Sequence, residues 1–210
     1  MYEKLATIAS FCQNASYRIS ENNETEVSGD PTEVAMLVLS HRIKAEEKGL
    51  TTGIVIVDDL PFTSEQKFRA TLIQYPDKRK ELLVMGAPEK LLNNSTSFFS
   101  GINAQPLSKN KKETLNHIID KFSEQGMRVI ACAFKPVGKN ITEINEHKIN
   151  DLTFAGLFGI IDPPREEVKD AIVKCKSASI RVIMVTGDHK KRQLQLPEKS
   201  EFWKRNMKKI

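Results

Sequence analysis

Near its end, the chain contains residues that suit the binding of a phosphoryl group. The apolar run at 182–185 leads directly into Thr186, Gly187 and Asp188. The hydroxyl and the backbone N–H groups of such a turn can donate hydrogen bonds to phosphate oxygens. No nucleophile in a matching pattern precedes them, so these residues predict that a phosphate donor is held without transfer of its phosphoryl group. An ordinary exit from a strand into a turn is the alternative interpretation.

Five further short patterns precede these residues, and each has an ordinary explanation by itself. Asp30 and Pro31 suit the start of a helix, and the paired prolines of residues 162–165 restrict the backbone of a loop. The order of all six patterns is more informative, because chance does not readily produce it. The five are GDPTE at 29–33, PFTSEQK at 61–67, MGAPE at 85–89, GMR at 126–128 and DPPR at 162–165.

In this order and spacing, the patterns resemble those of the P-type ATPases, cation pumps that pass through an aspartyl-phosphate. The spellings GDPTE, GAPE and DPPR favour the branch of the calcium and sodium pumps. The resemblance implies a nucleotide-binding domain at residues 1–150 and part of a phosphorylation domain of the haloacid-dehalogenase type at 151–189. Residues 190–210 lie beyond the resemblance and are expected to form a basic, disordered tail. The resemblance also implies that the chain is a fragment of such a pump and lies on the cytoplasmic side of a membrane.

The resemblance further implies an ATP site in the first domain. Phe62 matches the aromatic residue on which adenine stacks, and Glu33 matches the acidic residue that accepts a hydrogen bond from the adenine amino group. An aromatic face suits a stacked base, although a core Phe at a strand end is the alternative. The helix dipole also explains a Glu in a first helical turn. The residues implied for ATP binding are Glu33, Phe62, Lys67, Met85, Gly86, Ala87 and Arg128.

The remaining residues of the implied site supply charge and space. Lys67 and Arg128 match cations that face the phosphates, while Gly86 and Ala87 match small residues that let the base approach the backbone. Met85 departs from the family, which usually has Lys at this position. Losing the charge and donors of that Lys costs about 1–3 kcal/mol of binding. Replacing Met85 with Lys is therefore predicted to strengthen nucleotide binding.

For the phosphorylation domain, the resemblance implies a remnant and not a complete catalytic site. Thr186 matches the hydroxyl that binds the transferred phosphoryl oxygens, and Asp188 matches a residue near the nucleotide and magnesium. The hinge from the nucleotide-binding domain is matched by Asp162, Pro163, Pro164 and Arg165. The DKTGT string with the family's nucleophile and the magnesium-binding GDGxND string do not occur in the sequence. We expect this chain alone to bind ATP, used as Mg-ATP by the intact family, weakly or not at all, and not to hydrolyse it.

The elements that must position these residues predict an α+β fold. Helical periodicity predicts helices at 3–14, at 31–49 and from Ala87 onward, and a further helix that stops at Gly126. The apolar face of this last helix is formed by Leu115, Ile118, Ile119 and Phe122. Residues with high β-propensity predict strands at 53–60, 67–75, 80–85, 128–135 and 152–161. Residues 18–29 suit a loop or a weak hairpin, and Pro76-Asp77 suits a hairpin turn. This order predicts an antiparallel sheet flanked by helices, which would form the nucleotide-binding domain that the resemblance implies.

The C-terminal elements follow a different order. An apolar strand at 152–161, a helix at 165–178 and a short strand at 180–185 predict a β-α-β unit with parallel strands. The helix is expected to bury one face, made of Val168, Ala171, Ile172 and Cys175. Two strands cannot cover both faces of such a unit, so it is predicted to be an incomplete α/β piece of a larger sheet.

Composition excludes several classes of protein. The three cysteines and four histidines show no ligand spacing, which predicts reduced thiols and no metal site. No run reaches the roughly 20 apolar residues of a membrane helix, and the first residues do not resemble a signal peptide. We expect a soluble, cytoplasmic chain with no direct membrane insertion.

The net charge of +5 comes from the tail, because residues 190–210 carry +6 and residues 1–189 carry −1. Nucleic-acid binders usually carry their basic charge on a folded face, so we expect no nucleic-acid partner; binding through the tail is the alternative.

The tail at 190–210 also lacks helical patterning. The family that the chain resembles continues after Thr-Gly-Asp with a helix rich in small residues. A one-base shift of the tail's reading frame could encode such a helix, which suggests a frameshifted or split gene.

Two other functions stay open from the sequence. The chain could be a working subunit of a split ATPase, in which other chains supply the nucleophile and the membrane part. It could also be a phosphatase relative of the haloacid-dehalogenase type, although no DxD-type nucleophile precedes Thr186. The expected partners are ATP and the remaining domains of a P-type ATPase.

Overall fold

The computed structural model describes residues 2–19, 25–43, 45–161 and 166–183 of the 210-residue chain. The chain divides into two compact units. The first consists of Met1–Glu113 and Ile130–Phe158, and the second of Thr114–Val129 and Gly159–Ile210. The predicted hinge at 162–165, the phosphoryl-binding residues at 186–188 and the basic tail lie outside the described residues.

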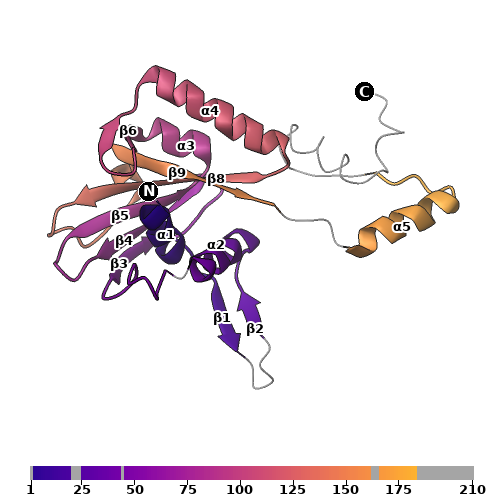
Figure 1. Ribbon diagram of the computed structural model, residues 1–210, viewed down its shortest axis with the longest axis horizontal. Coiled ribbons are helices and arrows are strands. Elements are labelled where there is room, and N and C mark those ends of the chain that lie inside the picture. The colour runs from indigo at the N-terminus through magenta and orange to yellow at the C-terminus, as the bar shows by residue number, and fades with distance from the viewer. Residues whose placement is uncertain (1, 20–24, 44, 162–165, 184–210) are drawn as a thin grey trace. The chain divides into compact units, whose positions relative to one another are not determined.

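A seven-stranded sheet forms the centre of the first unit (Figure 1), in the order β3-β4-β5-β8-β9-β6-β7. Its strands are β3 (Val55–Leu60), β4 (Phe68–Gln74), β5 (Lys80–Gly86), β6 (Ser95–Phe99), β7 (Ala104–Pro106), β8 (Arg128–Val137) and β9 (Leu152–Ile160). β3, β4, β5 and β8 pair antiparallel in succession, whereas β6 pairs parallel with β9. The predicted α+β class is confirmed, but the sheet is mixed and not antiparallel throughout.

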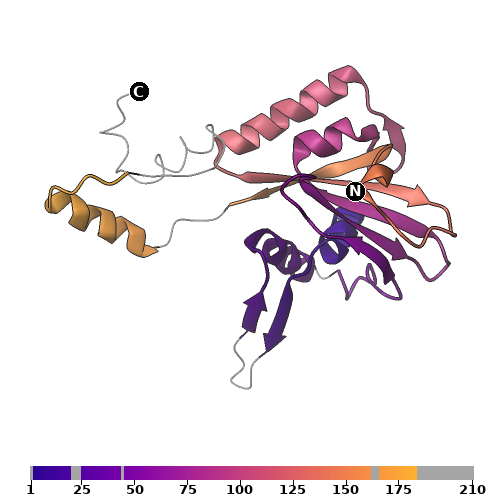
Figure 2. The same cartoon turned by 180° about the vertical axis from the view of Figure 1, so that it is seen from behind.

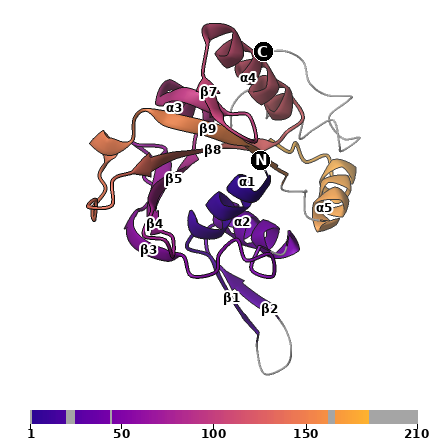
Figure 3. The same cartoon turned by 60° about the vertical axis from the view of Figure 1, so that its left-hand side comes forward.

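Helices cover both faces of this sheet. α1 (Tyr2–Phe11) and α2 (Pro31–Arg42) lie on one side and α3 (Pro88–Asn93) lies on the other, as Figure 3 shows. A hairpin of β1 (Ser16–Ile19) and β2 (Thr25–Ser28) connects α1 to α2 and forms a separate two-stranded sheet (Figure 2). The remaining helices are α4 (Lys109–Glu124), the 3-10 helix η1 (Glu146–Lys148) and α5 (Glu166–Ser177).

Local sequence signals account for the elements that matter most for the site. The side chain of Asp30 accepts a hydrogen bond from the N–H of Thr32 at 2.8 Å and caps α2, with Pro31 as its first residue. The turn between β4 and β5 is closed by a hydrogen bond from the N–H of Tyr75 to the carbonyl of Arg79 at 2.9 Å. β4 and β5 are buried on both faces, as expected for strands that helices cover from both sides.

The predicted helix at 31–49 is wrong beyond Arg42. Residues 45–52 form turns, and Gly49 has a positive φ of 70°. Residues 45–48 are good helix formers, but Ala45 is the only buried residue at 45–49. Helical propensity alone stabilises a short helix too little without an apolar face to pack, so the chain turns back earlier.

The predicted strand at 180–185 is wrong over its described part, because residues 180–183 are not in a strand. A short apolar run becomes a strand only when a neighbouring strand satisfies its backbone groups, and the described residues provide none. In α5, Val168 and Ala171 are exposed while Ile172 and Cys175 are half-buried, so the expected buried face is wrong for this structure. The assignment of 151–189 to a phosphorylation domain stays a prediction.

Two of the three cysteines are fully buried in the first unit. Cys12 and Cys132 have no exposed surface, whereas Cys175 in α5 is half-buried. Burial raises the pKa of Cys12 to about 12 and raises the pKa of Cys132 well above its usual value. Because the thiolate is the reactive form of cysteine, both buried thiols are inert near neutral pH.

We therefore expect one thiol, that of Cys175, to react rapidly with an aromatic disulfide reagent at pH 8 in the folded protein. All three should react after unfolding in urea. The same pKa shifts make the free energy of unfolding fall as the pH rises above about 8.5, because the unfolded thiols ionise first. Three rapidly reacting thiols in the folded protein would contradict the burial of Cys12 and Cys132.

Candidate functional site

The loop between β3 and β4 presents two of the predicted ATP-binding residues. Phe62 is 57% exposed, and Lys67 is exposed as well. The backbone of Lys67 is left-handed, with a φ of 57°, and its N–H donates to the carbonyl of Thr63 at 2.9 Å. The alternative of a core phenylalanine at position 62 is therefore excluded. An aromatic ring held in water on a defined turn is available to stack on a planar ligand.

The end of β5 lies directly against this loop. Gly86 pairs with Phe68, the first residue of β4, and a Cβ added to Gly86 would lie 2.5 Å from the Phe68 Cα and would also meet the carbonyl of Lys67. The N–H of Ala87 donates to that same carbonyl at 2.8 Å. Only glycine fits at position 86 beside β4, and the hydrogen bond brings Ala87 next to Lys67.

Glu33 lies in a buried ion cluster with Arg69 at its centre. Arg69 of β4 is only 2% exposed and pairs with Glu33 from α2 and with Asp59 from β3, the latter at 2.8 and 2.9 Å. It also donates to the side-chain oxygen of Asn14 at 3.2 Å, while the hydroxyl of Thr71 donates to Asp59 at 2.7 Å. Three elements of the first unit thus meet at one guanidinium.

The charges of this cluster hold Arg69 in its ionised form. Burial by itself would lower the pKa of Arg69, but the hydrogen bonds and the negative charge of Asp59, together with the charge of Glu33, outweigh burial and raise it. The Glu33 side chain is 19% exposed and Arg69 contacts its Oε1. One carboxylate oxygen of Glu33 is thus bound by the guanidinium, while part of the side chain stays open to solvent.

Sequence reasoning missed both Arg69 and Asp59. The one available signal was a charged residue within the otherwise apolar run at 68–73. Charged residues are almost never fully buried unless they are paired, so an Arg inside a strand that is buried on both faces predicts a partner. The sequence does not say which of its acidic residues supplies that partner.

Met85 and Arg128 occupy very different surroundings. Met85 is 4% exposed, and the pairing register places it opposite Arg69 on one side and Cys132 on the other. Arg128 begins β8, is exposed, and belongs to the second unit. Among the residues predicted to bind ATP, the structure brings Lys67, Gly86 and Ala87 together. Glu33 lies apart from these three in sequence and pairs with Arg69 of β4.

The burial of Met85 makes its replacement by Lys costly. We expect Met85→Lys to lower the free energy of unfolding by about 1–3 kcal/mol. The new ammonium would be buried, and it would lie beside the positive charge of Arg69. Met85→Leu is the matched control, since an apolar exchange of similar volume costs less than about 1.5 kcal/mol. Urea unfolding compares the two, and a Lys variant as stable as the Leu variant would contradict the burial of this position.

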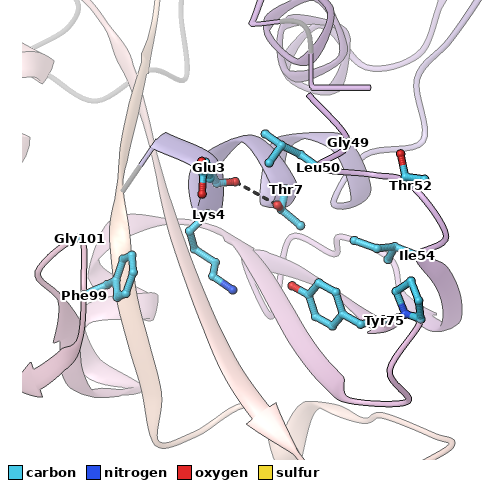
Figure 4. A pocket seen from close by; sticks show the side chains of 11 residues that line it. Glu3, Lys4, Thr7, Gly49, Leu50, Thr52, Ile54, Tyr75, Phe99 and Gly101 are labelled. Carbon is cyan, nitrogen blue, oxygen red and sulfur yellow. Dashed lines mark hydrogen bonds between the residues drawn. The ribbon is translucent and has the colours of Figure 1, made fainter. Parts of the chain in front are cut away.

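A separate cavity of about 410 Å³ lies elsewhere in the first unit. Figure 4 shows Lys4, Tyr75 and Phe99 around it, and none of the predicted ATP-binding residues lines it. The Lys4 ammonium and the Tyr75 hydroxyl both donate to the buried carboxylate of Glu81 at 2.8 Å. Burial and the negative charge of Glu81 raise the pKa of Tyr75. Two polar side chains that line the cavity, those of Lys4 and Tyr75, are thus bound to a buried carboxylate, which is typical of a structural role.

Neither a metal cluster nor a membrane-spanning helix occurs in the described part of the chain. No three His, Cys, Asp or Glu side chains within 2–19, 25–43, 45–161 and 166–183 are grouped so that they could hold a metal ion. Over the same residues, none of the helices is both long enough and apolar enough to cross a bilayer.

Comparison with known proteins gives a consistent result. The family model described as "P-type ATPase, cytoplasmic domain N" matches residues 1–167. The chain is 36% identical over 179 residues to the calcium-transporting ATPase 1 of Lactococcus lactis, covering 85% of this chain and 20% of that protein. It is 35% identical over 185 residues to the calcium-transporting ATPase 1 of Saccharomyces cerevisiae, covering 87% and 19%.

The similarity extends to pumps for other cations. The sodium/potassium-transporting ATPase subunit alpha of Drosophila melanogaster is 33% identical over 204 residues, covering 90% of this chain and 20% of that protein. The chain thus spans about a fifth of the length of these relatives. Because the family model covers most of the chain, the chain belongs to the P-type ATPases and contains their cytoplasmic domain N.

Proposed function

We propose that the first unit binds ATP, with the adenine ring stacked on Phe62 and the phosphates toward Lys67. The observation that carries this proposal is the exposure of Phe62 on a turn whose other end, Lys67, is hydrogen bonded to Ala87. An exposed aromatic face beside a lysine suits a ligand that combines a planar base with negative charge. Glu33, held by Arg69, is proposed to accept from the adenine amino group.

We further propose that the chain serves as the nucleotide-binding part of a cation-transporting P-type ATPase on the cytoplasmic side of a membrane. Its partners are then the remaining domains of that pump, whether these belong to the same protein or to separate chains. Arg128 is proposed to add positive charge toward the phosphates, and Thr186, Gly187 and Asp188 to contribute to phosphoryl binding in the assembled enzyme. Which cation is moved is a property of those other domains.

The 210 residues by themselves are proposed to bind ATP without cleaving it. Neither the DKTGT nor the GDGxND string occurs in them, and phosphoryl transfer needs a nucleophile and a metal as well as a positioned donor. The residues that the structure describes also contain no cluster of acidic, His or Cys side chains suited to a metal ion. An assay for phosphate release should give no signal above that of a Phe62→Ala control.

Titration of the isotope-labelled chain with ATP, followed by NMR, tests the proposal. We expect saturable shifts of the backbone N–H signals of Phe62, Lys67 and Gly86, and unchanged signals at Tyr75 beside the separate cavity. Adenosine should reproduce the shift at Phe62, whereas inorganic triphosphate should shift mainly Lys67. Absence of a saturable response to millimolar ATP, or a response centred on Tyr75, would remove the proposed site.

A further inference from the structure

The loop that carries Phe62 and Lys67 has a buried residue at its centre. Gln66 is 9% exposed, while residues 61–65 and Lys67 around it are exposed. Its side-chain Nε2 donates to the carbonyl of Pro61 at 2.5 Å and to the carbonyl of Phe68 at 2.9 Å. Both hydrogens of the amide are thereby used, and each goes to one end of the loop.

These two bonds continue the sheet where strand pairing stops. The last backbone pair between β3 and β4 joins Leu60 to Ala70, so Pro61 and Phe68 both lie just beyond the end of this ladder. The Gln66 amide links their two carbonyls and so closes the loop. The backbone N–H of Gln66 donates to the hydroxyl of Thr63 at 3.2 Å. This bond fixes the part of the loop next to Phe62.

The closed loop also fixes the backbone of Lys67, whose left-handed conformation is disfavoured for a residue other than glycine. A non-glycine residue with a φ of 57° persists only when its surroundings determine it. Here the N–H of Lys67 is bound to Thr63, and its carbonyl accepts from Ala87. The two carbonyls that the Gln66 side chain binds belong to Pro61 and Phe68, which are the chain neighbours of Phe62 and Lys67.

We infer that Gln66 is a positioning residue of the nucleotide site, which holds the Phe62 ring and the Lys67 ammonium at a fixed separation for a nucleoside triphosphate. This inference rests on the proposed ATP site. A pre-organised loop does not have to be ordered when ligand binds, and this saving appears as affinity. No atom of Gln66 is required to touch the nucleotide.

The test uses Gln66→Met, which keeps the length of the side chain but removes both donors. Gln66→Glu, whose ionised carboxylate can only accept hydrogen bonds, is the second variant in case the first does not fold. Gln105→Met on the exposed strand β7 is the matched control. Three quantities are measured on the full chain by NMR: the exchange rate of the Lys67 N–H without ligand, the Kd for ATP, and the ring-current shift of the adenine H2 and H8 signals at saturation.

In Gln66→Met we expect the Lys67 N–H to exchange at least about tenfold faster and the Kd for ATP to rise about 3- to 10-fold, as for the loss of one or two hydrogen bonds. The adenine shift at saturation should shrink, because Phe62 no longer holds one orientation. A merely structural role would lower the folded fraction but leave that saturated shift unchanged. Gln105→Met should match the unchanged protein in all three.

Two outcomes overturn the inference, and they are distinguishable. If the unchanged chain binds ATP normally and Gln66→Met keeps both the Lys67 exchange rate and the adenine shift, Gln66 does not position the site. If the unchanged chain shows no adenine shift, the proposed ATP site fails and the positioning role fails with it. In that second case the exchange rate of Lys67 still reports whether Gln66 closes the loop.

Discussion

Replacing Phe62 with Ala is expected to raise the Kd for ATP about 10- to 100-fold while leaving the stability of the fold nearly unchanged. Stacking of a base on an aromatic side chain contributes about 1–3 kcal/mol, and each 1.4 kcal/mol changes a Kd tenfold. Phe62 is 57% exposed, so its removal leaves no cavity in the core. Exposed substitutions of this kind usually change the free energy of unfolding by less than about 0.5 kcal/mol.

Two control variants separate stacking from unspecific effects. Phe62→Tyr keeps an aromatic face and should retain the affinity of the unchanged chain within about threefold. Tyr2→Ala removes another exposed aromatic ring, 83% exposed at the start of α1, and should have no effect on ATP binding. Titration by NMR gives all three Kd values, and urea unfolding gives the stabilities. Equal affinity of Phe62→Ala and the unchanged chain would show that the base does not stack at this position.

The parts of the fold that could be predicted are those with local signals. The cap of α2 was predictable because it depends only on adjacent residues: Asp30 accepts from the N–H of Thr32, and Pro31 is the first residue of the helix. β4 and β5 were predictable because two segments with residues of high β-propensity flank the hairpin-turn signal Pro76-Asp77. The exposed Phe62 followed from the resemblance, and the structure excludes the alternative of a core position.

Elements that depend on distant partners could not be predicted in this way. β6 begins with Ser95, Thr96 and Ser97 and has a weak strand signal, yet it pairs in parallel with β9, so that Ser95 lies opposite Leu152. The strand expected at 180–185 shows the converse. Its residues have high β-propensity, but over 180–183 no neighbouring strand satisfies their backbone groups and the strand is absent. Pairing across the sheet therefore decides more than propensity does.

The same limit applies to the candidate site. The sequence identifies Glu33 as an acidic residue in the first turn of a helix, but its partner Arg69 is 36 residues away and Asp59 is 10 residues from Arg69. No periodicity links these positions. The contact between them exists only because the fold brings the first turn of α2, which carries Glu33, to Arg69 of β4. Gln66 could not be predicted for another reason, since a single polar residue in a polar loop gives no sign that its side chain turns inward.

Replacing Arg69 with Met is expected to lower the free energy of unfolding by about 3–5 kcal/mol. Met restores most of the apolar volume but removes the guanidinium, and breaking a buried ion pair by removing one partner leaves the other charge without compensation. In this cluster two carboxylates, those of Glu33 and Asp59, lose their common partner and repel each other. A domain with a typical stability of about 5–15 kcal/mol would lose a large share of it.

The carboxylates themselves provide the decisive control. In the double variant Arg69→Met/Asp59→Asn, one of the two uncompensated charges is gone, and the Asn amide can still accept from the Thr71 hydroxyl that binds Asp59. We expect this variant to recover about 1–3 kcal/mol of the loss, since contacting residues in one network are coupled by amounts of this size. Urea unfolding of the four proteins in the cycle measures the coupling. If the losses of Arg69→Met and Asp59→Asn simply add, the two side chains do not stabilise each other, and Arg69 would act through its packing volume alone.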